Sequence, residues 1–194
     1  MPKKMTTNVE YPIADVIRKR RSGRAYADKE VAQNVINALF EAARWAPSSM
    51  NEQPWRYIYA TRENNSLWQK LFDALMEGNK VWAKHAPLLV LSLAKKNFDR
   101  NGQPNTAARY DLGAANALLS IQATELGLNV HQMGGFDGNQ IRKNLSIGDD
   151  FELGVIMAIG YPGDAEQLPE ALKQREMAPR IRKAQSEFVL NEIS

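Results

Sequence analysis

The predicted fold starts from the stretch Ala86-Pro87-Leu88-Leu89-Val90-Leu91-Ser92-Leu93-Ala94. An uninterrupted apolar run of this length after a proline is typical of a strand that is buried on both faces of a sheet. This stretch and residues 153–161 are the longest apolar stretches in the chain. Both are far shorter than the roughly 20 residues that a membrane-spanning helix needs. The run therefore predicts the middle of a sheet, and we expect no membrane partner.

Three further strands are expected around this central one. Alternating aromatic residues predict a strand at 55–59, directly after a polar, proline-bounded loop at 46–53. Residues 129–133 are typical of a short strand, and 153–160 form the last clear one. The strands alternate with segments of helical periodicity, which predicts helices packed on the sheet.

Two helices have strong signals. Val31 to Ala43 carries apolar residues on one side, with Asp28 as a candidate N-cap and an end before Pro47. The longest helix is predicted at about 106–126, with Gly127 as its C-terminal stop.

Three shorter helices are also predicted. The first starts near Pro12 and ends before Gly23, which makes residues 20–24 a helix end and a turn. Ser66 is a candidate cap for the second. Asp137, with Gln140 three residues later, predicts the start of the third.

Composition places the chain among globular proteins. The chain has 194 residues, 44% of them hydrophobic, and no repeat or long linker, so we expect one domain over 1–194, with an extended C-terminal arm over about 164–194. There is no cysteine, which excludes disulfides and thiolate catalysis. The first residues are polar and lack an apolar signal core, so we expect a cytoplasmic protein.

Well-known catalytic motifs are absent. The chain has no Walker A loop, no GxGxxG, no HExxH and no GxSxG. Its two histidines, His85 and His131, are too few for a histidine metal site, and each is more often structural than catalytic in such a position. We therefore expect no metal and no catalytic side chain.

Basic residues gather in two places that are far apart in the sequence. Arg20-Arg21-Ser22-Gly23-Arg24 combines three guanidiniums, a hydroxyl and a flexible glycine, which suits a phosphate. A second cluster runs from Lys173 to Lys183 and is interrupted only by Glu176. The two clusters could meet on one phosphorylated ligand, or they could form a dispersed nucleic-acid surface.

Two other motifs have the chemistry of a ring-binding site. The loop Pro47-Ser48-Ser49-Met50-Asn51-Glu52-Gln53 can present neutral donors and acceptors to a heteroaromatic ring, although Asn and Pro are common in any loop. Gln132-Met133-Gly134-Gly135 ends a strand on two glycines, which let backbone N–H groups approach a flat ligand closely. A pair of glycines is also an ordinary turn.

In their order and spacing these motifs resemble the flavin-dependent nitroreductase family, from about Val16 to Val189. The resemblance carried by Arg20-Arg-Ser-x-Arg and Ala-Pro-Ser-Ser-x-Asn-x-Gln-Pro-Trp is specific to that family. It implies an α+β, three-layer fold: a mixed, mostly antiparallel central sheet covered by helices. It also implies a homodimer with an exchanged C-terminal arm and one FMN at each of two sites in the subunit interface.

The resemblance also implies roles for individual residues. Arg20, Arg21 and Ser22 would face the FMN phosphate and ribityl chain, and Arg24 the polar edge of the ring. The backbone around Met133, Gly134 and Gly135 would lie beside the reactive ring nitrogen. Residues of the partner-facing loop would contact the FMN of the other subunit, and basic residues near the C-terminus would complete the phosphate site: Pro47, Ser48, Ser49, Asn51, Gln53, Arg180 and Arg182. Relatives often supply an Asn and a Lys to the ring edge, for which Asn79, Lys80 and Lys84 are candidates.

The implied activity is that of an FMN oxidoreductase. It would take hydride from NADPH or NADH and reduce nitroaromatics, quinones or similar small acceptors by a ping-pong mechanism. Three alternatives stay open: another flavin chemistry, such as reductive dehalogenation; a flavin-binding protein without turnover; and, more distantly, a basic nucleic-acid-binding module.

Overall fold

The computed structural model describes residues 9–191. Four strands form its sheet, in the order β1-β2-β4-β3, and all their pairings are antiparallel: β1 (Trp55–Thr61), β2 (Leu88–Lys95), β3 (Asn129–Met133) and β4 (Phe151–Gly160). A mixed sheet was expected, but no parallel strand pair occurs within residues 9–191, so the described sheet is purely antiparallel. β2 and β4 are therefore the central strands, and β1 and β3 are the edges.

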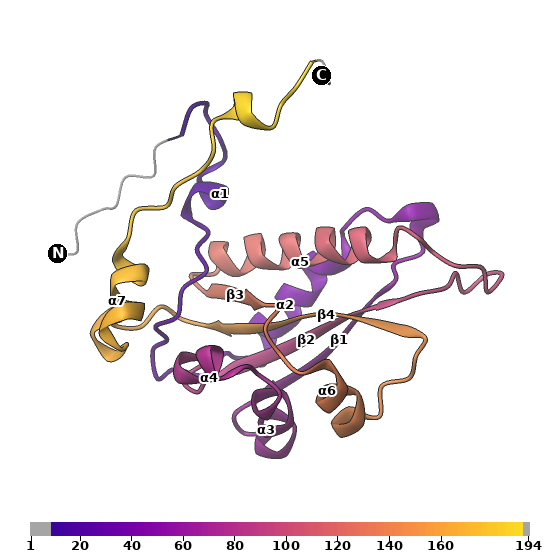
Figure 1. Ribbon diagram of the computed structural model, residues 1–194, viewed down its shortest axis with the longest axis horizontal. Coiled ribbons are helices and arrows are strands. Elements are labelled where there is room, and N and C mark those ends of the chain that lie inside the picture. Colours follow the sequence, from indigo (N-terminus) through magenta and orange to yellow (C-terminus); the bar gives the residue numbers. More distant parts are fainter. Residues whose placement is uncertain (1–8, 192–194) are drawn as a thin grey trace.

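The sheet is the middle of three layers (Figure 1). One face packs against α2 (Gln33–Arg44) and α5 (Ala108–Glu125), and the other against α3 (Asn65–Asp73), α4 (Glu77–Ala83) and α6 (Gly138–Leu145). The continuous apolar run of β2 is explained by these two cores. Leu88 and Val90 belong to the core under α2 and α5, whereas Leu89 and Leu91 belong to the opposite one.

The chain ends form two arms beside the sheet. The N-terminal arm leads into the short α1 (Asp15–Lys19). The C-terminal arm contains α7 (Glu170–Met177) and the 3₁₀ turns η2 (Ala165–Gln167) and η3 (Gln185–Glu187), and a further 3₁₀ turn, η1 (Ser49–Asn51), precedes β1. The two arms run side by side away from the three layers, as the indigo and yellow segments of Figure 1 show. Within residues 9–191 no helix has the length and apolar character needed to cross a membrane.

Of four predicted helix boundaries, one start and one end are correct and two starts are wrong. Asp137 caps α6, because its side chain accepts hydrogen bonds from the N–H groups of Asn139 and Gln140. Gly127 ends α5 with a positive φ of 78°. Neither Asp28 nor Ser66 is a cap, since α2 begins at Gln33 after Ala32 and α3 begins at Asn65 after Asn64.

Three other segments differ from expectation. α1 begins at Asp15, so Pro12 lies outside it. The stretch from Glu77 to Ala83, for which no element was predicted, is helix α4. The segment 164–191 was expected to be extended, but it contains α7 and two 3₁₀ turns.

Candidate functional site

The turn at 20–24 lies against β3, one edge of the sheet. Gly23 is buried there, and a Cβ added to it would stand only 2.2 Å from Asn129 Nδ2. His131 Nδ1 lies 3.0 Å from the carbonyl oxygen of Ser22 and 3.3 Å from that of Gly23. Only glycine permits such a close approach, which explains why Gly23 stands in this basic turn.

The structure brings the two basic clusters of the sequence together. Arg180 donates from its guanidinium to the carbonyl oxygens of Arg18 and Arg20, and Arg21 Nη2 donates to the carbonyl oxygen of Glu176 at 2.6 Å. Burial and the guanidinium of Arg182 lower the pKa of Arg20. Burial, with the charges of Arg21, Arg20, Arg182 and Arg18, lowers the pKa of Arg180. Guanidiniums crowded in this way repel one another, and an anion among them would relieve the repulsion.

The backbone of the turn offers further donors. The N–H groups of Arg21, Ser22 and Gly23 have no hydrogen-bond acceptor among residues 9–191. Arg20 Nη1 lies 3.3 Å from Ser22 Oγ, so this guanidinium and this hydroxyl are adjacent and could bind the same anion. Successive free N–H groups beside guanidiniums are the donor set of a phosphate site.

One carboxylate, that of Glu176 on α7, is embedded in the basic turn. Its Oε2 accepts from the Arg24 N–H at 3.0 Å and lies 3.9 Å from Arg24 Nη1, and its side chain is only 14% exposed. The contact fixes the direction of Arg24, whose guanidinium lies 6.0 Å from the centre of the Trp82 ring. No role was predicted for Glu176, although its position as the single acid in the second basic cluster was a signal.

His131 is half-buried beside the turn, and its contacts are those of a structural histidine. Its ring packs on Trp82, with 4.5 Å between ring centres. Burial, together with the charges of Arg24 and Arg20, lowers the pKa of His131 to about 4, against the weaker effect of its two backbone contacts. The ring is therefore neutral at pH 7.

Of the two glycines after β3, Gly134 leaves room for a flat ligand, whereas a Cβ added to Gly135 would stand 3.1 Å from Asn79 Nδ2. A Cβ added to Gly134 would meet nothing within 4 Å, and the N–H groups of Gly134 and Gly135 have no acceptor in the described chain. Asn79 Nδ2 donates to the Gly135 carbonyl oxygen at 3.0 Å, which brings α4 to this point. Met133 has its side chain in the core, so only its backbone is available to a ligand.

Asn79 is the best placed of the three candidates from α4 and its end. Lys80 forms an ion pair with Glu77 at 2.8 Å. The structure gives Lys84 no side-chain contact with the glycine turn, and its carbonyl oxygen accepts from Arg62.

The loop at 47–53 has a strained backbone. Met50, Asn51 and Gln53 all have a positive φ, between 52° and 56°, which residues other than glycine rarely adopt. Asp111, a buried carboxylate on α5, accepts from the Ser49 N–H at 3.0 Å, and Ser48 Oγ accepts from the Gln53 N–H at 3.0 Å. Strain of this kind clusters at functional sites. Asp111 was not predicted, because a single acid in a helix carries no distinctive signal.

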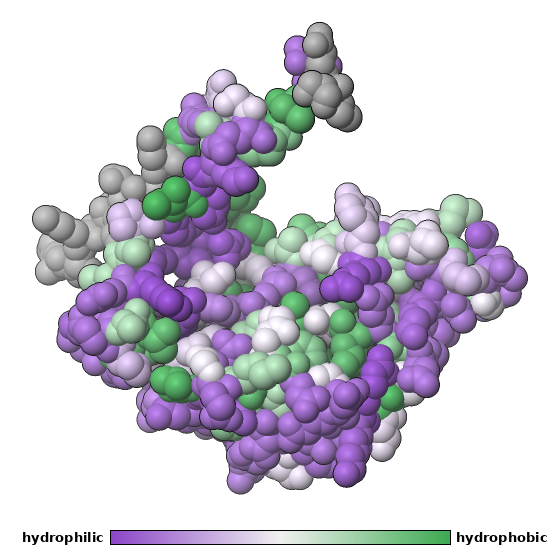
Figure 2. Space-filling model, in the orientation of Figure 1, coloured by the Kyte–Doolittle hydropathy of each residue, from purple (hydrophilic) through white to green (hydrophobic). Residues whose placement is uncertain are grey.

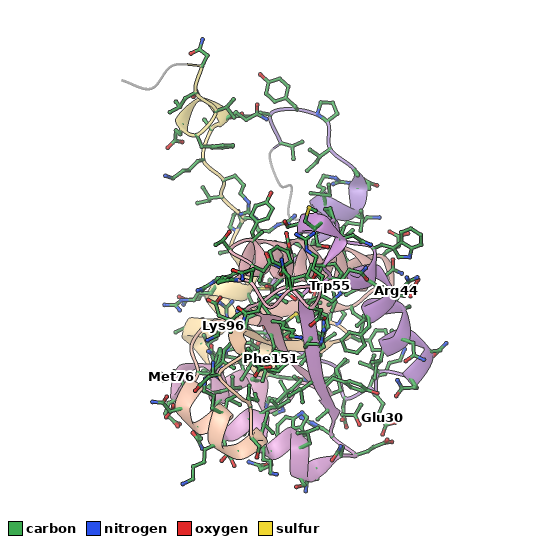
Figure 3. All side chains as sticks on the ribbon, turned by 90° about the vertical axis from the view of Figure 1, so that its right-hand side faces the viewer. Glu30, Arg44, Trp55, Met76, Lys96 and Phe151 are labelled. Carbon is green, nitrogen blue, oxygen red and sulfur yellow. The ribbon has the colours of Figure 1, made fainter. Side chains whose placement is uncertain are left out.

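The structure does not bring this loop to the basic turn. The loop leads into β1, whereas the turn lies on β3, and these strands are opposite edges of the sheet. Figure 3 shows Trp55, the first residue of β1, near Arg44 at the end of α2, while Met76, just before α4, lies on the other side of the ribbon. Within one chain the predicted site residues therefore form two separate groups.

A groove connects the basic cluster to the arms. Its walls combine apolar side chains with guanidiniums, namely those of Tyr11, Ile13, Ile17, Ile181, Phe188, Arg20, Arg180 and Arg182. The arms stand clear of the body in the space-filling view (Figure 2). A smaller pocket of about 280 Å³ lies between Arg20, Ser22, α5 and Gln132. No group of three or more Asp, Glu, His or Cys side chains that could hold a metal occurs over residues 9–191.

The chain is similar to known proteins over most of its length. The model of the nitroreductase family matches residues 17–81 and 68–161. A protein of Xanthomonas oryzae pv. oryzae, named as a proposed NADH dehydrogenase/NAD(P)H nitroreductase, is 27% identical over 175 residues, which cover 80% of this chain and 88% of that protein. A protein of Archaeoglobus fulgidus with the same name is 28% identical over 159 residues, with the same two shares covered.

Solved structures show the same fold. A crystal structure described as an oxidoreductase containing FMN has a TM-score of 0.91 and 32% identity, covering 98% of this chain and 97% of that one. A nitroreductase family protein of Clostridium difficile has a TM-score of 0.73 and 26% identity, with 95% and 100% covered.

Proposed function

The chain belongs to the nitroreductase family, and from this premise we propose that it is an FMN-dependent oxidoreductase that takes hydride from NADH or NADPH. When bound, FMN would supply the chemistry, because it accepts hydride from a nicotinamide and passes electrons to a second substrate. The protein then needs no nucleophile of its own. Its residues have to bind, orient and polarise the cofactor.

The observation that carries this proposal is the cluster of guanidiniums and free N–H groups at the turn. Arg20, Arg21 and Ser22, with the N–H groups of Arg21, Ser22 and Gly23, fit a phosphate. Of the C-terminal arginines, Arg180 holds the carbonyl oxygens of Arg18 and Arg20, whereas within residues 9–191 the Arg182 guanidinium donates only to the neighbouring Ile181 carbonyl, at 2.7 Å. Arg182 is therefore the better candidate for the phosphate, and Arg180 for shaping the turn.

The ring of the cofactor would lie between Arg24 and the glycine turn. The N–H groups of Gly134 and Gly135, which have no acceptor within residues 9–191, would donate to the ring nitrogen that gains electrons, and Arg24 would favour negative charge at the ring's carbonyl edge. Donor and acceptor that occupy the same face of the ring in turn would give ping-pong kinetics, with nitroaromatics, quinones or similar molecules as acceptors.

The proposed enzyme is a homodimer. The loop at 47–53 and the turn at 20–24 lie on opposite edges of one sheet, so residues Pro47, Ser48, Ser49, Asn51 and Gln53 could serve the same FMN only from a second copy. The strained but well-anchored loop supports this assignment, because its conformation has no evident use within a single chain. Each cofactor would thus be held by two subunits.

The direct test is a visible absorption spectrum of the purified protein, followed by anaerobic addition of NADPH and then NADH. We expect a flavin spectrum that bleaches with at least one donor and returns when an acceptor is added. A flavin that resists both donors would support a binding protein without turnover. A colourless protein that takes up no FMN would contradict the proposal.

A further inference from the structure

The carbonyl groups of the basic turn are held by three side chains. His131 contacts the carbonyl oxygens of Ser22 and Gly23. The buried Tyr26 hydroxyl lies 3.2 Å from the Gly23 carbonyl oxygen and shares its one proton between that oxygen and the Ala158 carbonyl oxygen at 2.9 Å. Arg180 binds the carbonyl oxygens of Arg18 and Arg20. In a planar trans peptide the C=O of one residue and the N–H of the next point in opposite directions. Whatever holds these carbonyls therefore decides where the N–H groups point.

His131 contacts the carbonyl groups at the centre of the turn and therefore controls the direction of the N–H groups there. When it holds the Ser22 carbonyl, the Gly23 N–H is turned away from β3, and this N–H has no acceptor among residues 9–191. Its second contact turns the Arg24 N–H away in the same manner, and that group meets Glu176 Oε2 at 3.0 Å. Carbonyl oxygens only accept hydrogen bonds, so the ring must donate from Nδ1 and carry its proton there.

We infer that His131 is a positioning residue: its Nδ1–H fixes the carbonyl side of the 20–24 turn and so presents the N–H and guanidinium side to the phosphate of the ligand. This role deepens the proposed function, on which it rests. His131 touches no reacting atom. It acts through the Ser22 and Gly23 peptides, and its ring is supported by Trp82.

A purely packing role for His131 makes the opposite prediction, which allows a sharp test. In His131→Asn the amide nitrogen stands near the place of Nδ1, but the side chain is smaller and packs less well on Trp82. In His131→Gln the amide nitrogen stands near the place of Nε2, and more of the ring's volume is kept. Packing therefore favours Gln, whereas the hydrogen bond favours Asn.

The measurement is the dissociation constant of FMN from cofactor-free protein, by quenching of flavin fluorescence. We expect His131→Gln to weaken binding about tenfold and His131→Asn to stay within about threefold of wild type, because carbonyls that lose their donor no longer hold the turn in its binding conformation. His85→Asn and His85→Gln are the matched controls, since His85 is exposed and lies away from the turn. Equal losses in the two His131 variants, or a smaller loss in His131→Gln, would overturn the inference.

Two further measurements separate this inference from the proposed function. Inorganic phosphate is tested on the same variants by its effect on the melting temperature. If phosphate raises the melting temperature of the wild type but FMN does not, the proposed cofactor is wrong. The inference then still predicts a larger response to phosphate in His131→Asn than in His131→Gln. Nitrogen chemical shifts of His131 in the wild type do not depend on any variant. They should show the proton on Nδ1 at pH 7, and a proton on Nε2 would overturn the inference.

Discussion

The guanidiniums around the 20–24 turn are held by backbone carbonyl oxygens more than by acids. Arg180 and Arg21 both donate to carbonyl oxygens, and Glu176 is the only carboxylate in contact with the turn's side chains among residues 9–191. A carbonyl orients a guanidinium without cancelling its charge. The cluster therefore keeps a strong positive field for an anion.

This arrangement predicts the effect of removing two of the charges. Arg20→Ala combined with Arg24→Ala should weaken FMN binding by at least about a hundredfold, because hydrogen bonds to charged groups contribute about 1.5–3 kcal/mol each. The fold should persist, since neither side chain belongs to the buried core and Glu176 keeps its bond to the Arg24 N–H. Equilibrium titration with FMN and circular dichroism measure the two effects.

Arg44→Ala is the matched control for that experiment. Arg44 is an exposed arginine in an ion pair with Glu41, at 2.6 Å, and lies at the end of α2. Its removal should leave FMN affinity unchanged. Full retention of FMN by the double variant would refute the phosphate assignment.

At the scale of the elements, the start of α6 is fixed both by its own cap residue, Asp137, and by a hydrogen bond from Asp137 to another part of the chain. The Asp137 side chain accepts from the N–H groups of Asn139 at 2.9 Å and Gln140 at 3.0 Å, and the Asp137 N–H donates to the Ala74 carbonyl oxygen at 2.7 Å. The cap thus joins α6 to the end of α3, next to the glycine turn of the candidate site.

Removal of this cap should destabilise the protein by a modest amount. Asp137→Ala is expected to lower the free energy of unfolding by about 1 kcal/mol, because two helix N–H groups lose their acceptor, whereas Asp137→Asn should keep most of it. Urea denaturation measures both. A loss in Asp137→Asn as large as in Asp137→Ala would show that the charge, and not the cap geometry, is what stabilises α6.

At the scale of the whole molecule, the C-terminal arm exposes several large apolar side chains to solvent. Ile181 is 85% exposed, and Phe188, Val189 and Leu190 are each more than 60% exposed. Contiguous exposed apolar side chains mark interaction surfaces. The proposed second copy, which the cofactor site also needs, is the partner that would cover them.

The proposed dimer predicts a linked loss of assembly and cofactor. The wild type should sediment as a dimer at micromolar concentration. Phe188→Asp combined with Leu190→Asp should shift it toward the monomer, because charges would be buried in the interface, and FMN binding should fall in parallel as the partner's loop is lost. Analytical ultracentrifugation with detection at the flavin wavelength follows both. A monomeric wild type that binds FMN fully would contradict the two-subunit site.

The sequence by itself determined the main elements and most of their order. Periodicity located β2, α2 and α5, because burial against a sheet imposes a repeat that is visible residue by residue. Gly127 and Asp137 marked their elements correctly, since a positive φ and a helix cap are local requirements. Asp28 and Ser66 failed as caps because the same residue types also favour turns, and α4 was missed because its seven residues form too short a pattern.

Only the tertiary structure decided how the candidate site residues are grouped. It brought Arg180 and Arg182 to Arg20 and placed Glu176 and His131 on the turn, contacts that join residues more than 100 positions apart. It also put the loop at 47–53 on the opposite edge of the sheet. The reason is physical: motifs report which chemistry a segment can perform, whereas strand order and packing determine which segments meet.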